Sequence, residues 1–357
     1  MRILLLQPGV TPLDLFLSLS DHQVERVGGG ERLSWSAFSA LCRSLRSNPP
    51  SIVLVTDREK SFLPPGVGWI RGAGSCWRAF MKNSQDFFIF TLFNWAVRQG
   101  LPIAMVNRSD DGRLLPGSDW FYRRCHTCFV RELYPLPEIA LRELFTPSGG
   151  NPQTNRRARW ITSWFDPTCP RQRDISKLRP ISLGVPDGVV GNPPSQKEKS
   201  WDIFFAGDLH EKGFRGRLVG EMQALTGGTG WKILLRDRLP HGEYVECLAA
   251  SRLCVSPPGM GWDCWRHYEA MLAGSIPVMP YPTILSYQPP RDGEHCFYFA
   301  PEQGGLTRCL ERALADSSRF PAMAKAGHTL VMEHHTYPKL REYVIRETLQ
   351  AHARSKN

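Results

Sequence analysis

The chain has 357 residues, of which 42% are hydrophobic and 22% charged. This is the composition of a globular protein, and no apolar run approaches the roughly 20 residues that a transmembrane helix needs, so any membrane contact is expected to be peripheral. The length exceeds one ordinary hydrophobic core and predicts two domains, and the net charge of +10 favours an anionic partner: a nucleotide diphosphate, a nucleic acid, an acidic glycan or a membrane surface.

The first half of the chain predicts alternating strands and helices. Arg2 to Gln7 is a continuous apolar run, which is typical of a buried parallel strand. The further elements expected are a helix from 33 to 45, a strand at 52–56, a strand at 87–90, a helix at 91–98 and a strand at 102–106. This alternation is typical of a parallel sheet flanked by helices, which binds ligands at the carboxyl ends of its strands.

Three loops of this half carry side chains suited to a site. Gly28-Gly29-Gly30-Glu31 precedes the first helix, and Asp110 and Asp111 follow the strand that ends at 106. Asp commonly forms turns by bonding its own backbone, so these carboxylates are either turn formers or functional groups at the sheet edge. In the third loop, residues 155 to 179 carry seven basic against two acidic residues, an excess of +5, interleaved with Trp160 and Trp164.

That third stretch has two interpretations. Its arginines, Arg157 among them, could hold phosphates while Trp160 and Trp164 stack on bases or sugars. Alternatively, the tryptophans are core residues and the arginines are their solvated edge.

The cysteines favour a reducing compartment, and hence the cytoplasm. The ten are scattered, and several lie within apolar runs, as buried free thiols do. Cys125 and Cys128 have the spacing of half a zinc site, but the chain holds no second pair at that spacing. The sequence therefore predicts no bound metal.

The second half begins after a Gly-, Pro-, Ser- and Lys-rich linker at 186–200. It predicts strands at 201–206, 231–235, 251–255 and 296–299, with helices at 216–225, 244–250, from 306 onward and at 337–353. At its centre, Ser251 to Met279 reads as strand, Pro-Gly-rich turn, helix and strand. A helix that starts after a glycine turn attracts phosphate, and Arg266 and Glu269 share one face of this helix.

Residues 269 to 278, Glu-Ala-Met-Leu-Ala-Gly-Ser-Ile-Pro-Val, resemble the donor-site signature of glycosyltransferases with the GT-B fold. The preceding Pro-Pro-Gly and the Arg266-x-x-Glu269 spacing resemble the exostosin-type branch. The resemblance implies an α/β protein with two facing Rossmann-like domains: an acceptor domain at 1–188, a donor domain at 200–335 and a terminal helix at 336–357 that crosses back to the first domain.

In this resemblance Glu269 binds the donor ribose and cations meet the diphosphate. The residues expected to bind donor are Gly207, Lys212, Arg236, Gly259, Gly261, Arg266 and Glu269. Those expected to bind acceptor are Gly29, Gly30, Glu31, Arg157, Trp160 and Trp164. Retaining families have Arg where this chain has Asp208, and Glu where it has Gly261. The exostosin-like pattern fits better and implies inversion, with Asp110 or Asp111 as general base; His22, Glu31, Asp119 and His126 are alternatives.

The function expected is metal-independent transfer of a sugar from a nucleotide sugar, which acts as co-substrate, so that no cofactor is needed. The acceptor expected is a surface glycan or lipopolysaccharide-type glycolipid, with peripheral docking on anionic membrane. The alternatives are a phage-type enzyme that glycosylates hydroxymethylated pyrimidines in DNA, and a GT-B-like binding module without turnover.

Overall fold

The computed structural model describes residues 1–7, 22–28, 33–56, 84–107, 119–135, 175–186, 198–259 and 261–356. The chain forms two compact units. Met1–Ile181 together with Arg341–Asn357 make the first, and Ser182–Leu340 make the second.

The first unit is built on a parallel sheet of six strands in the order β2-β1-β3-β4-β5-β6. The strands are β1 (Arg2–Gln7), β2 (Gln23–Gly28), β3 (Ile52–Thr56), β4 (Ile103–Asn107), β5 (Thr127–Val130) and β6 (Leu178–Pro180). Every residue of β1, β3, β4 and β5 is buried, which explains their nearly continuous apolar sequences.

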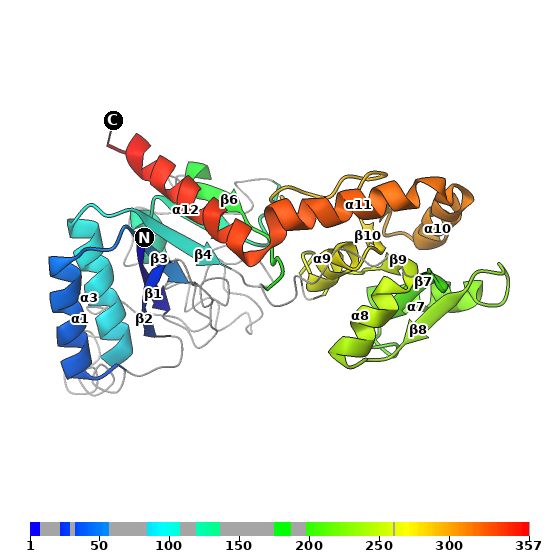
Figure 1. The fold of residues 1–357 in the computed structure, drawn as a ribbon, viewed down its shortest axis with the longest axis horizontal. Helices are drawn as coiled ribbons and strands as arrows, with labels where there is room; N and C mark the ends of the chain where they lie inside the picture. Colours follow the sequence, from blue (N-terminus) through cyan, green and yellow to red (C-terminus); the bar gives the residue numbers. More distant parts are fainter. Residues whose placement is uncertain are drawn as a thin grey trace, which may run out of the picture. The chain divides into compact units, whose positions relative to one another are not determined.

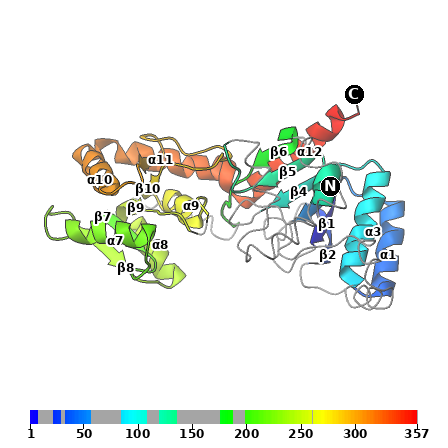
Figure 2. The same cartoon turned by 180° about the vertical axis from the view of Figure 1, so that it is seen from behind.

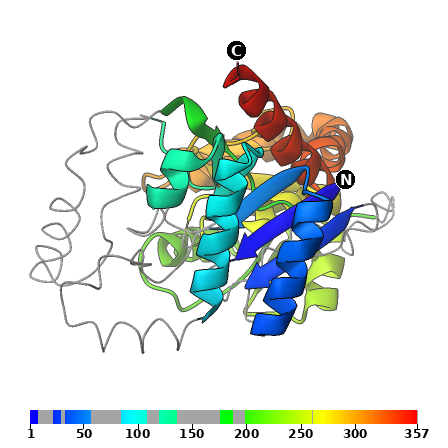
Figure 3. The ribbon, with the colours of Figure 1, turned by 90° about the vertical axis from the view of Figure 1, so that its left-hand side faces the viewer.

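Helices α1 (Trp35–Ser47) and α3 (Ser84–Arg98) cover one face of this sheet (Figure 3). Their aromatic side chains interlock, with the rings of Phe38 and Phe88 stacked at 4.1 Å. Ser34 caps α1 by accepting a hydrogen bond from the backbone N–H of Ala37 at 3.2 Å. The unit also contains α4 (Asp119–Arg124) and the short 3-10 helix η4 (Ile175–Lys177). No helix in the described part of the chain is both long and apolar enough to cross a membrane.

The last helix, α12 (Tyr337–Arg354), packs on β5 and β6 of the first unit (Figure 2). The Tyr343 hydroxyl donates to the Pro180 carbonyl at 3.1 Å. The hydroxyl groups of Thr348 and Thr127 lie 2.8 Å apart, in hydrogen-bond contact and fully buried. These contacts confirm the predicted return of the chain to its first domain.

The second unit has a parallel sheet of five strands in the order β11-β10-β9-β7-β8 (Figure 1). The strands are β7 (Trp201–Ala206), β8 (Ile233–Arg236), β9 (Ser251–Val255), β10 (Ile276–Pro280) and β11 (Phe297–Phe299). The helices are α7 (Phe214–Leu225), α8 (His241–Ala249), α9 (Trp265–Leu272), α10 (Gly305–Ala315) and α11 (Phe320–Leu330), which continues into the π-helical turn η7 (Val331–His335). This half of the chain follows the predicted order of elements.

Two predictions for the first unit are wrong. Residues 87–90, expected as a strand, belong to α3, because their four apolar residues form the second turn of a 15-residue helix with only one face in the core. Strand β2 was missed because it is an edge strand, and its polar Gln23, Glu25 and Arg26 hide the apolar pattern.

A buried histidine links the two ends of the second unit. His335 is fully buried, with Nδ1 2.9 Å from the Ser182 hydroxyl and Nε2 3.0 Å from the Gln288 carbonyl. The backbone N–H of Val185 donates to the His335 carbonyl at 2.9 Å, and Tyr337 N–H donates to the Val185 carbonyl at 3.0 Å. The segment that enters the unit is therefore bonded to the segment that leaves it.

Acid should weaken this link. Burial lowers the pKa of His335 to about 4, against 6.5 for an ordinary histidine. Between these values the unfolded chain binds more protons than the folded one, so stability is complete above about pH 6.5 and is lost as the pH falls toward 4. Glutamine does not titrate in this range. Between pH 6.5 and 4 the free energy of unfolding of His335→Gln should therefore fall less than that of the native protein, by up to about 3 kcal/mol.

Urea unfolding at pH 7 and pH 4.5 measures this difference. The control is His210→Gln, because the His210 side chain is exposed. Equal acid sensitivity of the native protein and His335→Gln would contradict the prediction.

Candidate functional site

The candidate site lies at the carboxyl edge of the second sheet, where β9 leads through a Pro-Gly turn into α9. His267 holds both ends of this turn: its Nδ1 is 2.7 Å from the Ser256 hydroxyl, and its Nε2 is 2.9 Å from the Trp262 carbonyl. The Trp262 indole N–H donates to the Pro280 carbonyl at 3.2 Å, which fixes the turn to the end of β10. Both ends of the turn are therefore held in place by their surroundings.

Cys264 precedes α9 and lies against His267, but the two do not form a nucleophilic pair. Its sulfur is 3.6 Å from both ring nitrogens of His267. Equal distances at this range put the sulfur over the face of the ring, whereas imidazole nitrogens bond in the ring plane, where Ser256 and Trp262 already lie. The histidine is a support for the turn.

Arg266 joins the turn to the end of β7. Its Nη1 donates to the Pro257 carbonyl at 3.4 Å and its Nη2 to the Ala206 carbonyl at 3.2 Å, while the guanidinium carbon lies 5.4 Å from the centre of the Phe205 ring. The Nε atom is buried and makes no hydrogen bond within the described part of the chain. A guanidinium fixed in this way presents a positive charge at the start of α9.

Arg215 approaches the same turn from α7. Its Nη2 donates to the Pro258 carbonyl at 3.0 Å, and Nη1 forms an ion pair with Glu211. Its Nε is also buried and lacks a partner among the described residues. Two arginines from different helices thus bind consecutive carbonyls of one glycine turn, and this is an arrangement suited to a diphosphate. Arg215 was not predicted from the sequence, because 43 residues separate it from Pro258 and leave no local pattern.

Glu269 is held by a tyrosine from the neighbouring helix α8. The Tyr244 hydroxyl donates to Oε2 of Glu269 at 3.1 Å. Burial raises the pKa of Glu269, while the bond from Tyr244 and the charges of His241 and Arg266 oppose that rise. The second carboxylate oxygen, Oε1, is thereby oriented for another hydrogen bond, such as one from a hydroxyl group.

Tyr244→Phe tests whether this orientation is used. Loss of one hydrogen bond to a carboxylate should weaken nucleotide binding by about tenfold, and it should raise the pKa of Glu269 further, so that the defect grows on mild acidification. Calorimetric titration with a nucleoside diphosphate and its 2′-deoxy and 3′-deoxy forms measures the effect. If Tyr244 has a purely structural role, Tyr244→Phe should lose affinity equally for all three nucleotides. If Tyr244 orients Glu269 toward a ribose hydroxyl, the affinity for the deoxy form that lacks this hydroxyl should not change.

The structure brings several predicted donor residues together. Gly207 lies beside Arg266: a Cβ atom there would stand 3.6 Å from its Nη2 and 3.0 Å from the Phe205 ring. The Gly207 N–H donates to the Arg236 carbonyl at 3.2 Å, which joins the ends of β7 and β8. A Cβ at Gly259 would meet open space, so the turn is accessible at that point. Gly261 is half-buried two residues further along the turn.

Among the described residues, no hydrogen bond or ion pair joins the side chains of Lys212 and Arg236 to those of Arg266 and Glu269. Both side chains are exposed, Lys212 in the loop after β7 and Arg236 at the end of β8.

The predicted acceptor residues and the two aspartates favoured as general base lie outside the described residues. They are Gly29, Gly30, Glu31, Asp110, Asp111, Arg157, Trp160 and Trp164. Their assignments stay predictions. The described strand β4 ends at Asn107, three residues before Asp110.

Comparison with known proteins points to the same part of the chain as the candidate site. Residues 236–283 match the model of the family described as RXYLT1 C-terminal domain. This segment contains the glycine turn, Arg266 and Glu269. No curated protein sequence matches the chain.

Three solved structures are similar in fold. A glycosyltransferase from Rickettsia africae ESF-5 is similar over 98% of this chain and 98% of its own, with 8% identity and a TM-score of 0.50. The GtfA/B complex is similar over 91% of this chain, which spans 62% of that chain, with 10% identity and a TM-score of 0.47. An alpha-glucosyltransferase in complex with UDP-glucose and DNA containing an abasic site is similar over 98% and 99%, with 9% identity and a TM-score of 0.46.

The protein therefore has the GT-B fold of glycosyltransferases, with one parallel α/β sheet in each of two units, as predicted. Within that class, the family match at 236–283 confirms the resemblance to the exostosin-like branch.

Proposed function

We propose that the protein is a glycosyltransferase that moves a sugar from a nucleotide-sugar donor to an acceptor hydroxyl. The observation that carries the proposal is the glycine turn at 257–261, bound by Arg215 and Arg266 and followed by Glu269 on α9. The guanidinium groups and the start of α9 would hold the diphosphate, and Glu269 would bind the ribose hydroxyls.

Transfer requires stabilisation of the departing diphosphate, whose negative charge grows as the bond to the sugar breaks. Arg215 and Arg266 come from different helices and are already ordered, so they need little rearrangement when that charge develops. The charge of Arg266, together with the ordered N–H donors of Arg215, which is itself paired with Glu211, supplies the kind of stabilisation that a divalent metal gives in other enzymes, and we therefore propose a metal-independent reaction. The general base that would activate the acceptor is Asp110 or Asp111, by the prediction from sequence.

The acceptor that we favour is a surface glycan or glycolipid in the cytoplasm, the compartment favoured by the cysteine content. A DNA acceptor with hydroxymethylated pyrimidines is the second candidate, and the excess of +5 over residues 155 to 179 favours it. Duplex binding that falls steeply as salt rises would support the DNA acceptor, and no binding at low salt would exclude it.

A thermal-shift screen against UDP-, GDP-, ADP-, CMP- and dTDP-sugars tests the proposal. A donor at 100 times its Kd should stabilise the folded state by about 2.7 kcal/mol. Release of free sugar from that donor, unchanged by a chelator, would support a metal-independent enzyme. Absence of both binding and turnover with an intact fold would contradict the proposal, and binding without turnover would identify a binding module.

A further inference from the structure

The excess positive charge of the protein belongs entirely to its first unit. Residues 1–181 and 341–357 contain 28 Lys and Arg against 17 Asp and Glu, a net charge of +11, whereas residues 182–340 contain 16 against 17, a net charge of −1. The nucleotide is expected to bind the nearly neutral unit, so donor binding does not account for this asymmetry.

Much of this charge lies where helices of the first unit end. Five segments, 43–51, 98–102, 123–127, 175–178 and 350–356, contain no acidic residue. Their basic residues, which we call the basic rim, are Arg43, Arg46, Arg98, Arg123, Arg124, Lys177, Arg354 and Lys356.

Hydrogen bonds place these segments along the amino edge of the sheet. At the start of β1, Arg2 donates to the carbonyl of Ser44 at 3.2 Å and to that of Asn48, where α1 ends. The N–H of Val53, in β3, donates at 2.9 Å to the carbonyl of Pro102, in the segment that follows α3. The first two rim segments therefore adjoin the starts of neighbouring strands.

The remaining segments continue along the same edge. The N–H of Ile103, at the start of β4, donates to Nδ1 of His126 at 3.0 Å. The His126 ring lies 4.7 Å from that of His352, near the end of α12. Lys177 donates to the carbonyl of Arg123, at the end of α4, at 3.2 Å. The rim thus follows the edge from β1 to β6.

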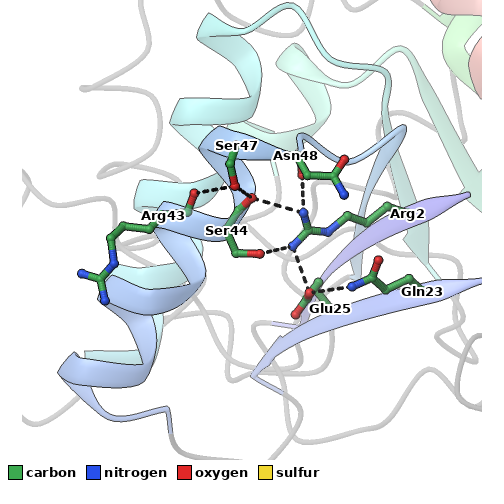
Figure 4. Close-up of polar contacts among 7 residues, drawn as sticks. All are labelled: Arg2, Gln23, Glu25, Arg43, Ser44, Ser47 and Asn48. Carbon is green, nitrogen blue, oxygen red and sulfur yellow. Dashed lines mark hydrogen bonds and ion pairs between the residues drawn. The ribbon is translucent and has the colours of Figure 1, made fainter.

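Figure 4 contrasts one residue of the rim, Arg43, with an ionic contact within the fold. Arg2 is buried and forms an ion pair with Glu25 at 3.0 Å, so its charge is neutralised within the protein. Arg43 lies on the adjoining helix and is exposed, and its side chain points away from this network.

The helix dipole does not explain the rim by itself. Cations are favoured in the last turn of any helix, and α1, α3, α4 and α12 have them there. In the second unit α10 and α11 carry Arg312 and His328 there, but α7, α8 and α9 have none, although they flank a sheet of the same type. The same chain thus contains helices that end without basic residues, and the rim exceeds what the dipole requires.

We propose that the basic rim docks the protein on an anionic lipid bilayer. The cations come from several elements along one sheet edge, and helix ends there present carbonyls, so the surface suits a diffuse layer of headgroup phosphates better than one buried phosphate. The apolar side chains of Met1 and Ile175, each 40% exposed, lie at the same edge and can enter the headgroup region.

Nucleic acid fits this edge less well. Single-stranded binding uses exposed aromatic rings, and among the described residues of this unit the exposed tryptophan is Trp35, which stands at the beginning of α1, the end opposite the rim. The carboxyl edge, where α/β sheets bind ligands, is also opposite the rim. Docking through the rim therefore leaves that edge in the aqueous phase that holds nucleotide sugars.

Sedimentation with vesicles tests the inference. We expect the protein to bind vesicles of phosphatidylcholine with phosphatidylglycerol and not to bind vesicles of phosphatidylcholine alone. Added salt should release the bound protein. The variant Arg43→Gln/Arg98→Gln/Lys356→Gln should bind on the order of a hundredfold more weakly, since each cation near an anionic surface contributes roughly fivefold.

The matched control, Lys232→Gln/Arg252→Gln/Lys325→Gln, removes three charges from exposed positions of the second unit. It should retain binding, and thermal unfolding should show both triple variants to be folded. Equal loss in the two variants, or no binding by the native protein, would overturn the inference. So would a rim variant that loses affinity for duplex DNA but keeps its affinity for vesicles. Donor binding is measured separately by thermal shift. A protein that binds no donor but still binds anionic vesicles would contradict the proposed function and leave the docking inference intact.

Discussion

Arg266→Ala is expected to weaken binding of the preferred nucleoside diphosphate by a hundredfold to a thousandfold. The guanidinium lies at the start of α9, between the end of β7 and the glycine turn. Removal of a partly buried, hydrogen-bonded cation from a phosphate site costs about 3 to 4 kcal/mol. Arg266→Lys should recover only part of the loss, because one ammonium cannot reproduce the two bonds of the planar group.

Titration calorimetry with the nucleoside diphosphate and with the parent nucleoside separates binding from folding. The nucleoside lacks phosphate, so Arg266→Ala should change its affinity little, whereas a distorted site would bind both ligands poorly. Arg238→Ala is the control, since its side chain is 83% exposed near the end of β8. Undiminished diphosphate binding by Arg266→Ala would show that Arg266 serves only to hold the turn.

Arg215 extends this test to the second cation. If both arginines meet one diphosphate, the losses in Arg215→Ala and Arg266→Ala should not add, because residues that share a ligand are coupled. The double variant would then bind only modestly worse than either single variant. This coupling would explain how the site works with Asp208 at the position where retaining GT-B families have arginine.

The donor half was predictable because its signal is local. Strand, turn, helix and strand follow one another between Ser251 and Met279, so the sequence itself places Arg266 and Glu269 beside the glycine turn. The buried strands of both sheets were predictable for the same reason, since strands covered on both faces are apolar throughout.

Contacts between distant elements could not be predicted in this way. Tyr244 reaches Glu269 only because α8 and α9 lie side by side, and Arg215 reaches Pro258 only because α7 begins beside the turn. Nothing in the sequence near either residue depends on its partner, and both positions read as ordinary helix surface. Strand β2 escaped prediction for a related reason: an edge strand needs little apolar character of its own when a buried neighbour such as β1 supplies the pairing.

Asp263→Ala should cause the largest loss of stability among the substitutions considered, about 4 kcal/mol. Asp263 is 4% exposed, and it accepts hydrogen bonds from the Leu183 N–H at 2.6 Å and from the Tyr268 hydroxyl at 2.5 Å. Alanine would leave both donors buried without these bonds, at about 1 to 3 kcal/mol each. Asp263→Asn keeps one acceptor oxygen, so its loss should be about half as large.

Urea unfolding, followed by intrinsic tryptophan fluorescence, measures these losses. Asp202→Ala is the control, because Asp202 is half-buried at the sheet periphery, where it accepts from the Lys232 N–H at 3.0 Å and forms an exposed ion pair with Arg252 at 3.6 Å, so its removal should cost about 1 kcal/mol. Asp263 connects the segment that enters the second unit, at Leu183, to the residues just before α9. Its loss should therefore also loosen the turn that holds Arg266, and nucleoside diphosphate binding should fall together with stability. Binding that stays intact while stability falls would show that Ser256, His267 and Trp262 are sufficient to hold the turn.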